Sequence, residues 1–255
     1  MDIKRCINKD TLNSFARTNE KILTGPIRGV ALEFPGLGGG SCMGGVDAVG
    51  DYSAAYGLRC GHENILLAYV FSGPWSWMND SAVKITDAVV DAIWDRYQLS
   101  EDIPLISTGG SMGGCGALLY SIYGKRTPFA CAANGPACDA MDVYRTHPDF
   151  ARTLLTAVAH YECSFEQAMT SLSAIHLVDR LPKIPYYIVH TDMDDILPIE
   201  RHSDILVKLL RERGHEVTYS VVPDRGHCDL PPGDWNAMVR WVIRQVQRCE
   251  EIMRK

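Results

Sequence analysis

Three side chains with complementary chemistry stand at comparable places in this chain, each just after an apolar run. Ser111 follows the run 103–107, a group of aspartates follows 184–190, and His227 follows 217–222. A serine hydroxyl is a poor nucleophile at neutral pH and needs a base to take its proton. Histidine titrates near neutrality, and a carboxylate can fix its tautomer and stabilise the imidazolium. These residue types predict a nucleophilic Ser111, with His227 as general base and then general acid.

The glycines around Ser111 have a steric explanation. A nucleophile that projects from a sharp turn between a strand and a helix has a strained backbone, and its neighbours two positions away on either side come close together. Side chains at 109 and 113 would collide in such a turn, so glycine suits both positions. The helical pattern 115–123 follows the turn. The whole stretch therefore predicts a strand, a nucleophile elbow and a helix.

Several acids and histidines compete for the other two roles. Asp192, Asp194 and Asp195 share one acidic loop, and side chains so close together are not separated by spacing alone. For the two aspartates that are not the acid, solvent contact or helix capping is the alternative. Among the eight histidines, His227 is favoured because it is preceded by glycine in a loop after the last predicted strand. His190, which ends a strand, is its competitor.

The elements that position these residues alternate between strand and helix. Strands are predicted at 27–34, 64–70, 103–107, 129–133, 184–190 and 217–222, and helices at 51–60, 80–97, 115–123, 150–160, 165–173, around 205–210 and from 234 onwards. Asp80 or Ser81 is the expected cap of the second helix, and Asp234 of the last. The alternation predicts an α/β fold with a mostly parallel sheet of about six or more strands and helices on both faces. Loops at the carboxyl ends of such strands bind ligands.

We expect one domain over 1–255, with two segments outside the alternating pattern. Residues 1–26 are polar with scattered apolar positions and are predicted to form an N-terminal extension without recognisable chemistry. Residues 138–180 contain two predicted helices and no strand. This second segment is predicted to be a small helical cap or insertion that sets specificity.

Composition excludes several classes of function. A formal net charge of −6, without a basic run, argues against nucleic acid as a partner. No apolar stretch is long enough to span a bilayer, and the charged N-terminus without an apolar core predicts a cytoplasmic protein. The nine cysteines are irregularly spaced, which fits free thiols, and no residue cluster has metal-ligand spacing. No metal is predicted, and no signal for an oligomeric state is present.

Together the motifs resemble those of α/β-hydrolase-fold serine hydrolases. The sequence GGSMGG at 109–114 resembles their nucleophile elbow, IVHTDMDDILP at 188–198 their H-G-x-x-D-x-x-V-P stretch, and the Gly-His pair 226–227 their last loop. Thr191 departs from the usual glycine. The resemblance covers roughly 27–246 and is nearest to the dienelactone-hydrolase-like and prolyl-oligopeptidase-like branches. It implies Asp194 as the triad acid, ahead of Asp195 and then Asp192, and treats His190 as structural.

Acyl transfer also needs two donors for the developing oxyanion. One is expected to be the backbone N–H of Met112, directly after the nucleophile, and the resemblance assigns the other to Leu37, with Gly38 next. The glycines at 36 and 38 also hint at a dinucleotide-binding turn. However, Ser41 stands where a third glycine belongs, and no convincing helix follows. No cofactor is therefore predicted.

The pocket and the reaction complete the prediction. Gly38, Trp75 and Trp77 are candidates for lining a substrate pocket. The two tryptophans follow a central strand, and ordinary loop packing is the alternative for them. The expected function is hydrolysis of a small-molecule carboxylic ester through an acyl-enzyme. One rival is a peptidase or amidase of the prolyl-oligopeptidase-like type. Another is a hydrolase fold that binds a ligand without catalysis, against which the complete Ser/Asp/His set argues.

Overall fold

One twisted sheet forms the centre of the molecule in the computed structural model, which describes residues 2–38 and 55–254. Within these residues seven strands lie in the order β1-β3-β2-β4-β5-β6-β7. Their bounds are β1 Ala16–Thr18, β2 Gly29–Phe34, β3 Ile65–Val70, β4 Leu105–Gly110, β5 Ala130–Asn134, β6 Tyr186–Thr191 and β7 Val217–Val222. β1 is antiparallel to β3, and the other neighbouring pairs are parallel. The mostly parallel α/β sheet predicted from the sequence is confirmed.

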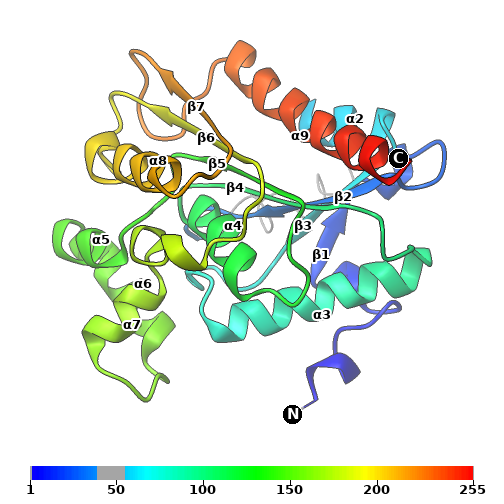
Figure 1. Ribbon diagram of the computed structural model, residues 1–255. Helices are drawn as coiled ribbons and strands as arrows, with labels where there is room; N and C mark the ends of the chain where they lie inside the picture. Colours follow the sequence, from blue (N-terminus) through cyan, green and yellow to red (C-terminus); the bar gives the residue numbers. More distant parts are fainter. Residues whose placement is uncertain (1, 39–54, 255) are drawn as a thin grey trace.

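Helices cover both faces of this sheet (Figure 1). The α-helices are α2 Ala55–His62, α3 Asp80–Tyr97, α4 Met112–Tyr123, α5 Ala140–Thr146, α6 Pro148–Val158, α7 Phe165–Ser171, α8 Ser203–Glu212 and α9 Pro232–Met253. Single turns of 3₁₀-helix span Ile3–Arg5, Leu12–Ser14, Glu20–Ile22, Ala174–His176, Val178–Arg180 and Ile199–Arg201. α2 and α9 pack on one face, and α3, α4 and α8 pack on the other. The first four residues of the helix predicted at 51–60 lie outside the described residues.

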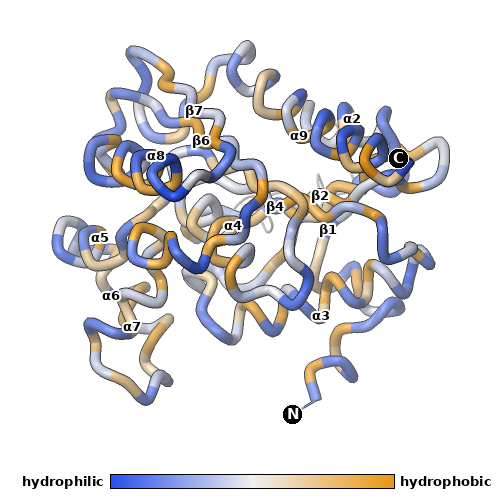
Figure 2. Tube along the Cα trace, viewed as in Figure 1, coloured by the Kyte–Doolittle hydropathy of each residue, from blue (hydrophilic) through white to orange (hydrophobic). Residues whose placement is uncertain are grey.

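The central strands β2 to β6 are buried on both faces because each sheet face has its own core. Side chains from β2 alternate between them: Leu32 and Phe34 join the larger core with α3, α4 and α8, whereas Ala31 joins the smaller core with α2 and α9. Figure 2 shows the apolar residues concentrated along the central strands and on the inward sides of the helices. Glu33 is the charged exception in β2, on the α2/α9 side and only 7% exposed.

Three local boundaries differ from the sequence predictions. Asn79, not Asp80 or Ser81, caps α3, because its side chain accepts a hydrogen bond from the Ala82 N–H at 2.9 Å. Asp234 lies inside the first turn of α9, which begins with proline at its first position. β1 comes from the predicted extension 1–26 and pairs along the edge of the sheet.

The segment between β5 and β6 holds three helices rather than two. α5 precedes the predicted pair, which the structure places at α6 and α7. Asp139 caps α5 by accepting hydrogen bonds from two backbone N–H groups of its first turn. The segment is tied to the rest of the domain by Tyr123, whose hydroxyl donates to the Ser171 carbonyl at 2.9 Å, and by the Trp77 indole, which donates to the Thr153 hydroxyl at 2.9 Å.

Candidate active site

Ser111 stands at the apex of the turn between β4 and α4. Its backbone has φ 57° and ψ −125°, a conformation that a non-glycine residue adopts at a cost of about 1–3 kcal/mol. A Cβ at Gly109 would overlap the carbonyl of Gly113, and one at Gly113 would overlap the carbonyl of Phe34. The elbow therefore requires both glycines, and Gly113 is required by its contact with β2 rather than by a side chain at 109.

A continuous hydrogen-bonded chain runs from Ser111 through His227 to Asp194. His227 Nε2 lies 2.8 Å from Ser111 Oγ, and His227 Nδ1 lies 2.6 Å from Asp194 Oδ2. An ionised carboxylate only accepts hydrogen bonds, so the imidazole proton belongs on Nδ1. The lone pair of Nε2 is then directed at the serine hydroxyl, which is the arrangement that proton removal requires.

Asp194 is held as an anion by four donors. Its side chain is fully buried; Oδ2 also accepts from His190 Nε2 at 3.1 Å, and Oδ1 accepts from the N–H groups of Ile196 at 3.0 Å and Leu197 at 2.8 Å. Burial opposes ionisation, but the hydrogen bonds from His190, His227 and Leu197 outweigh it. The pKa of the Asp194 carboxyl therefore lies well below its usual range.

The competing residues of the acidic loop point elsewhere. Asp192 is exposed and accepts a hydrogen bond from the Asp224 N–H at 2.7 Å, which joins the two loops that carry Asp194 and His227. Asp195 is exposed. His190 is fully buried, with its Nδ1 2.7 Å from the Ser203 hydroxyl. The structure thus brings Asp194 to His227, and places His190 behind the carboxylate.

His227 is partly shielded from solvent, and its neighbours favour its charged form. Burial opposes the imidazolium, but the hydrogen bond to Asp194 and the thiol of Cys228, 3.7 Å from Nε2, outweigh burial and raise the pKa of His227 above its ordinary value. The stabilised imidazolium is the species that forms when His227 takes the serine proton.

The two predicted oxyanion donors lie on the elements expected for them. Met112 is the first residue of α4, where helical N–H groups have no partner in the helix, and Leu37 lines a cavity beside Ser111. In the described part of the chain neither N–H has a hydrogen-bond acceptor. Gly38, by contrast, has φ +88° and donates its N–H to the Pro74 carbonyl at 2.8 Å. This favours Leu37 over Gly38 as the donor; residues 39–42 of the same loop lie outside the described residues.

Ser111 and His227 line a cavity of about 380 Å³. Its other described lining residues are Glu33, Phe34, Gly36, Leu37, Tyr69, Trp77, Gly110, Ala137, Phe150, Ile196, Leu197 and Cys228. Of the two predicted tryptophans, Trp77 is buried in this wall, whereas Trp75 is 49% exposed and takes no part. Gly38 is also not among the lining residues. Phe150 of α6 brings the predicted cap segment to the cavity.

The sequence prediction missed Glu33, which lines this cavity from the end of β2. A signal was present, because a glutamate is the only charged residue in the otherwise apolar stretch 29–34. A buried carboxylate without a stabilising partner is costly, so a charge at such a place points to a specific role.

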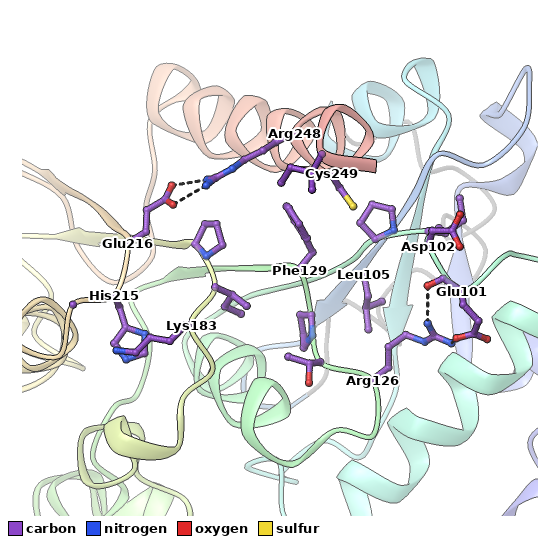
Figure 3. A pocket seen from close by; sticks show the side chains of 18 residues that line it. Glu101, Asp102, Leu105, Arg126, Phe129, Lys183, His215, Glu216, Arg248 and Cys249 are labelled. Atoms are coloured by element: carbon purple, nitrogen blue, oxygen red, sulfur yellow. Dashed lines mark hydrogen bonds and ion pairs between the residues drawn. The ribbon is translucent and has the colours of Figure 1, made fainter. Parts of the chain in front are cut away.

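A separate cavity of about 590 Å³ lies at the opposite edge of the sheet, at the amino ends of the parallel strands (Figure 3). Its arginines are already paired: Arg126 with Glu101 at 2.6 Å and Arg248 with Glu216 at 2.7 Å. It contains no serine or other activated nucleophile among its described lining residues. The carboxyl edge, with Ser111, is the better candidate for chemistry.

In residues 2–38 and 55–254, no group of three or more His, Cys, Asp or Glu side chains is arranged to hold a metal ion. No helix in the same ranges is both long and apolar enough to cross a membrane. The cysteines in these ranges are free thiols.

Comparison with known proteins places these features in a wider group. Residues 82–246 match the sequence model of the prolyl oligopeptidase family. No curated protein matches the chain. Among solved structures, a puromycin hydrolase is 17% identical with a TM-score of 0.63, over 76% of this chain and 31% of its own. Esterase B from Lactobacillus rhamnosis is 12% identical with a TM-score of 0.67, over 91% of this chain and 80% of its own.

A third similar structure is the acylaminoacyl peptidase of Pyrococcus horikoshii, 11% identical with a TM-score of 0.62, over 91% of this chain and 37% of its own. The chain thus spans about a third of the length of the two peptide- or puromycin-cleaving enzymes, and four fifths of the esterase. At these identities the likeness establishes the shared fold. The α/β-hydrolase fold predicted from the motifs is confirmed.

Proposed function

Because the chain belongs to the prolyl oligopeptidase family and is an α/β-hydrolase-fold serine hydrolase, we propose that it cleaves carboxylic esters through a covalent acyl-enzyme. Ser111 is the nucleophile, His227 the general base and acid, and Asp194 the residue that orients His227. The observation that carries this proposal is the unbroken hydrogen-bond chain from Ser111 Oγ through both nitrogens of His227 to Asp194 Oδ2.

In acylation, His227 Nε2 takes the proton from Ser111 Oγ while Oγ bonds to the carbonyl carbon of the ester. The electron pair of the carbonyl bond moves to the oxygen, giving a tetrahedral oxyanion. When the oxyanion collapses, the bond to the alcohol oxygen breaks, and the leaving alkoxide takes the proton from His227. Acylated Ser111 and a free alcohol result.

In deacylation, water takes the place of the alcohol. His227 Nε2 accepts a proton from the water as its oxygen bonds to the acyl carbon, and the second tetrahedral oxyanion forms. Its collapse breaks the bond to Ser111 Oγ, which recovers the proton from His227. The carboxylic acid product leaves, and the enzyme is restored.

The oxyanion in both steps is assigned to the N–H groups of Met112 and Leu37. Donors placed in advance stabilise the charge without reorganising at the moment of reaction, and losing one typically costs about 2.7–4 kcal/mol of transition-state stabilisation. Leu37 follows Pro35 and Gly36 after the end of β2, and Met112 opens α4, so the two donors come from different elements.

A fluorophosphonate probe tests the nucleophile directly, because it reacts covalently with an activated serine. We expect one label per chain at Ser111, loss of labelling in Ser111→Ala, and normal labelling in Ser100→Ala, which alters an exposed serine. Ester hydrolysis in Ser111→Ala is expected to fall by about 10⁴-fold or more. A folded chain in which Ser111 stays unlabelled contradicts the proposal.

Amide or peptide hydrolysis is a second candidate, favoured by the family match and by the two peptide- or puromycin-cleaving enzymes among similar structures. The same triad chemistry serves both bonds, since only the leaving group differs. Two substrates that share one acyl group, an aryl ester and the corresponding anilide, separate the candidates. Ester cleavage without anilide cleavage supports an esterase, and efficient turnover of both supports an amidase.

A further inference from the structure

Glu33 lies between two cavities at the carboxyl edge of the sheet. It lines the cavity that holds Ser111 and His227, and it also lines a second cavity of about 340 Å³. Gly110 and Cys228 belong to both walls, so the two spaces adjoin one another beside the nucleophile. The glutamate is in register with Thr108, three residues before Ser111. At about 3.3 Å per residue, the Cα atoms of Glu33 and Ser111 are roughly 10 Å apart along the strand direction. A short substrate and the glutamate side chain together bridge this distance.

The Glu33 carboxyl accepts a hydrogen bond from the Thr108 hydroxyl. Thr108 Oγ1 bonds to Glu33 Oε2, lies 2.8 Å from the Leu32 carbonyl and 3.3 Å from the Tyr56 hydroxyl. A threonine hydroxyl has one proton to donate. Burial raises the pKa of Glu33, and the Thr108 proton directed at Oε2 lowers it by a smaller amount.

Among the described residues, Glu33 forms no ion pair with a cationic side chain. Tyr56 and Cys60 of α2 face it, and burial raises the pKa of both, so both are neutral. Tyr69 of β3 and His227 are the other titratable groups in the wall it shares with Ser111, besides the thiol of Cys228. Burial also raises the pKa of Glu33 itself, to about 7. A cation that entered here would therefore meet a carboxyl that accepts a hydrogen bond from Thr108 and forms no ion pair in the described part of the chain.

The second cavity adds an aromatic surface. Trp235 of α9 lines it together with Glu33, and Met238 and Leu230 complete its apolar side. Tyr56 packs against the edge of Trp235, with ring centroids 5.6 Å apart, which holds the indole in place. A carboxyl beside an indole is a combination that binds ammonium groups, through an ion pair on one side and a cation–π contact on the other.

We propose that Glu33 recognises an ammonium group of the substrate, which makes amino esters, or the matching amino amides, the preferred substrates of the Ser111 site. The inference rests on the proposed serine hydrolase activity. The ester carbonyl lies at Ser111, and the amine extends past Gly110 into the second cavity, between Glu33 and Trp235. On binding, a protonated Glu33 releases its proton to the solvent, and the ammonium donates to the resulting carboxylate.

Isosteric ester pairs in which a methyl replaces the ammonium test this proposal. Two pairs place the amine on the acyl side: alanine methyl ester with methyl isobutyrate, and β-alanine methyl ester with methyl butanoate. A third pair, 3-aminopropyl acetate with butyl acetate, places it on the alcohol side. For each pair, the ratio of kcat/KM for the ammonium ester to kcat/KM for the methyl ester is measured by titration of released acid. Differences in intrinsic ester reactivity cancel when the wild-type ratio is divided by the variant ratio.

In Glu33→Gln, which keeps the size and hydrogen-bonding shape of the side chain, we expect the ratio to fall about tenfold or more for at least one pair. Glu33→Asp keeps the charge but withdraws it by one methylene, and is expected to retain a ratio between those of wild type and Glu33→Gln. Equal ratios in wild type and Glu33→Gln for all three pairs overturn the role of Glu33. A wild-type protein that hydrolyses no ester and resists the fluorophosphonate probe instead overturns the serine hydrolase itself, so the two failures are distinct.

Discussion

Replacing Glu33 by glutamine should stabilise the protein at alkaline pH and leave its stability nearly unchanged in mild acid. The carboxyl is buried, and burial raises its pKa by more than the hydrogen bond from the Thr108 hydroxyl lowers it. Ionisation in the folded state therefore opposes burial, whereas in the unfolded chain the same carboxylate is hydrated. Glutamine carries no charge at any pH and can occupy the same space.

The pKa of Glu33 determines the sign and the size of this change in stability. Burial raises the pKa of Glu33 from 4.5 to about 7, so between these values the folded state holds a proton that the unfolded state has lost. The contribution of Glu33 to the free energy of unfolding is intact below about pH 4.5 and is lost progressively as the pH rises through about 7. At about 1.4 kcal/mol for each pH unit, the loss is roughly 3 kcal/mol above pH 8.

Denaturant unfolding of wild type and Glu33→Gln at pH 5 and pH 8.5 measures this difference, since other titrating groups are common to both proteins. We expect similar stability at pH 5 and a gain of about 3 kcal/mol for the variant at pH 8.5, or about 6–12 °C in Tm for a chain of this size. Glu251→Gln, at an exposed carboxyl of α9, is the matched control and should show no such gain. A Glu33→Gln variant that is less stable than wild type at both pH values refutes the reasoning, because it means that the carboxylate has a stabilising partner.

Three further predictions concern the triad and the elbow. Asp194→Asn should lower kcat by about 10⁴-fold, whereas Asp195→Asn, at an exposed position, should leave it within about twofold; steady-state ester hydrolysis checks both. Because interactions with the neighbouring groups raise the pKa of His227 and the base must be neutral, kcat/KM should fall as the pH drops through a pKa above 6.5; a limb at or below 6.5 contradicts this. Gly113→Ala should destabilise the fold by about 3 kcal/mol or more, because its Cβ would overlap a carbonyl of β2, while Gly233→Ala in α9 should not, as thermal unfolding of both will show.

Most of the architecture could be predicted because its signals are local. Apolar runs predicted six parallel strands, and each overlaps an observed one with ends that differ by at most three residues, since strands buried on both faces, as β2 to β6 are, contain few polar residues. β1 was missed because three residues with one buried side chain carry almost no pattern. The cap of α3 was misplaced by one residue because Asn79, Asp80 and Ser81 are all good capping residues, and only the three-dimensional structure decides among them.

The candidate site was predictable where residue type and place in the topology agree. Ser111 and His227 each follow a strand of a parallel sheet, so the fold brings them to one edge. The choice of Asp194 as the triad acid depended on the family resemblance, because the three neighbouring aspartates differ only in the direction in which their side chains point. In the structure one of them turns inward to four donors while Asp192 and Asp195 face solvent. Such contacts determine where a side chain in a loop points, and the spacing of residues along the sequence does not reveal it.

Glu33 was not predicted because it lies in a regular strand and not in a loop. Its apolar neighbours give the stretch the hydrophobic pattern of a buried strand, which hides a single charged residue. Glu33 and Ser111 both reduce the free energy of unfolding. The ionised Glu33 carboxyl costs roughly 3 kcal/mol and the strained Ser111 backbone about 1–3 kcal/mol, whereas the whole free energy of unfolding of a protein is typically about 5–15 kcal/mol. Both face one cavity. A structural role for Glu33 predicts that Glu33→Gln loses stability at every pH, whereas a substrate-binding role predicts a gain at alkaline pH together with a loss of selectivity for ammonium esters. Unfolding and kinetics therefore examine the same carboxyl independently, and only the second role agrees with both expected results.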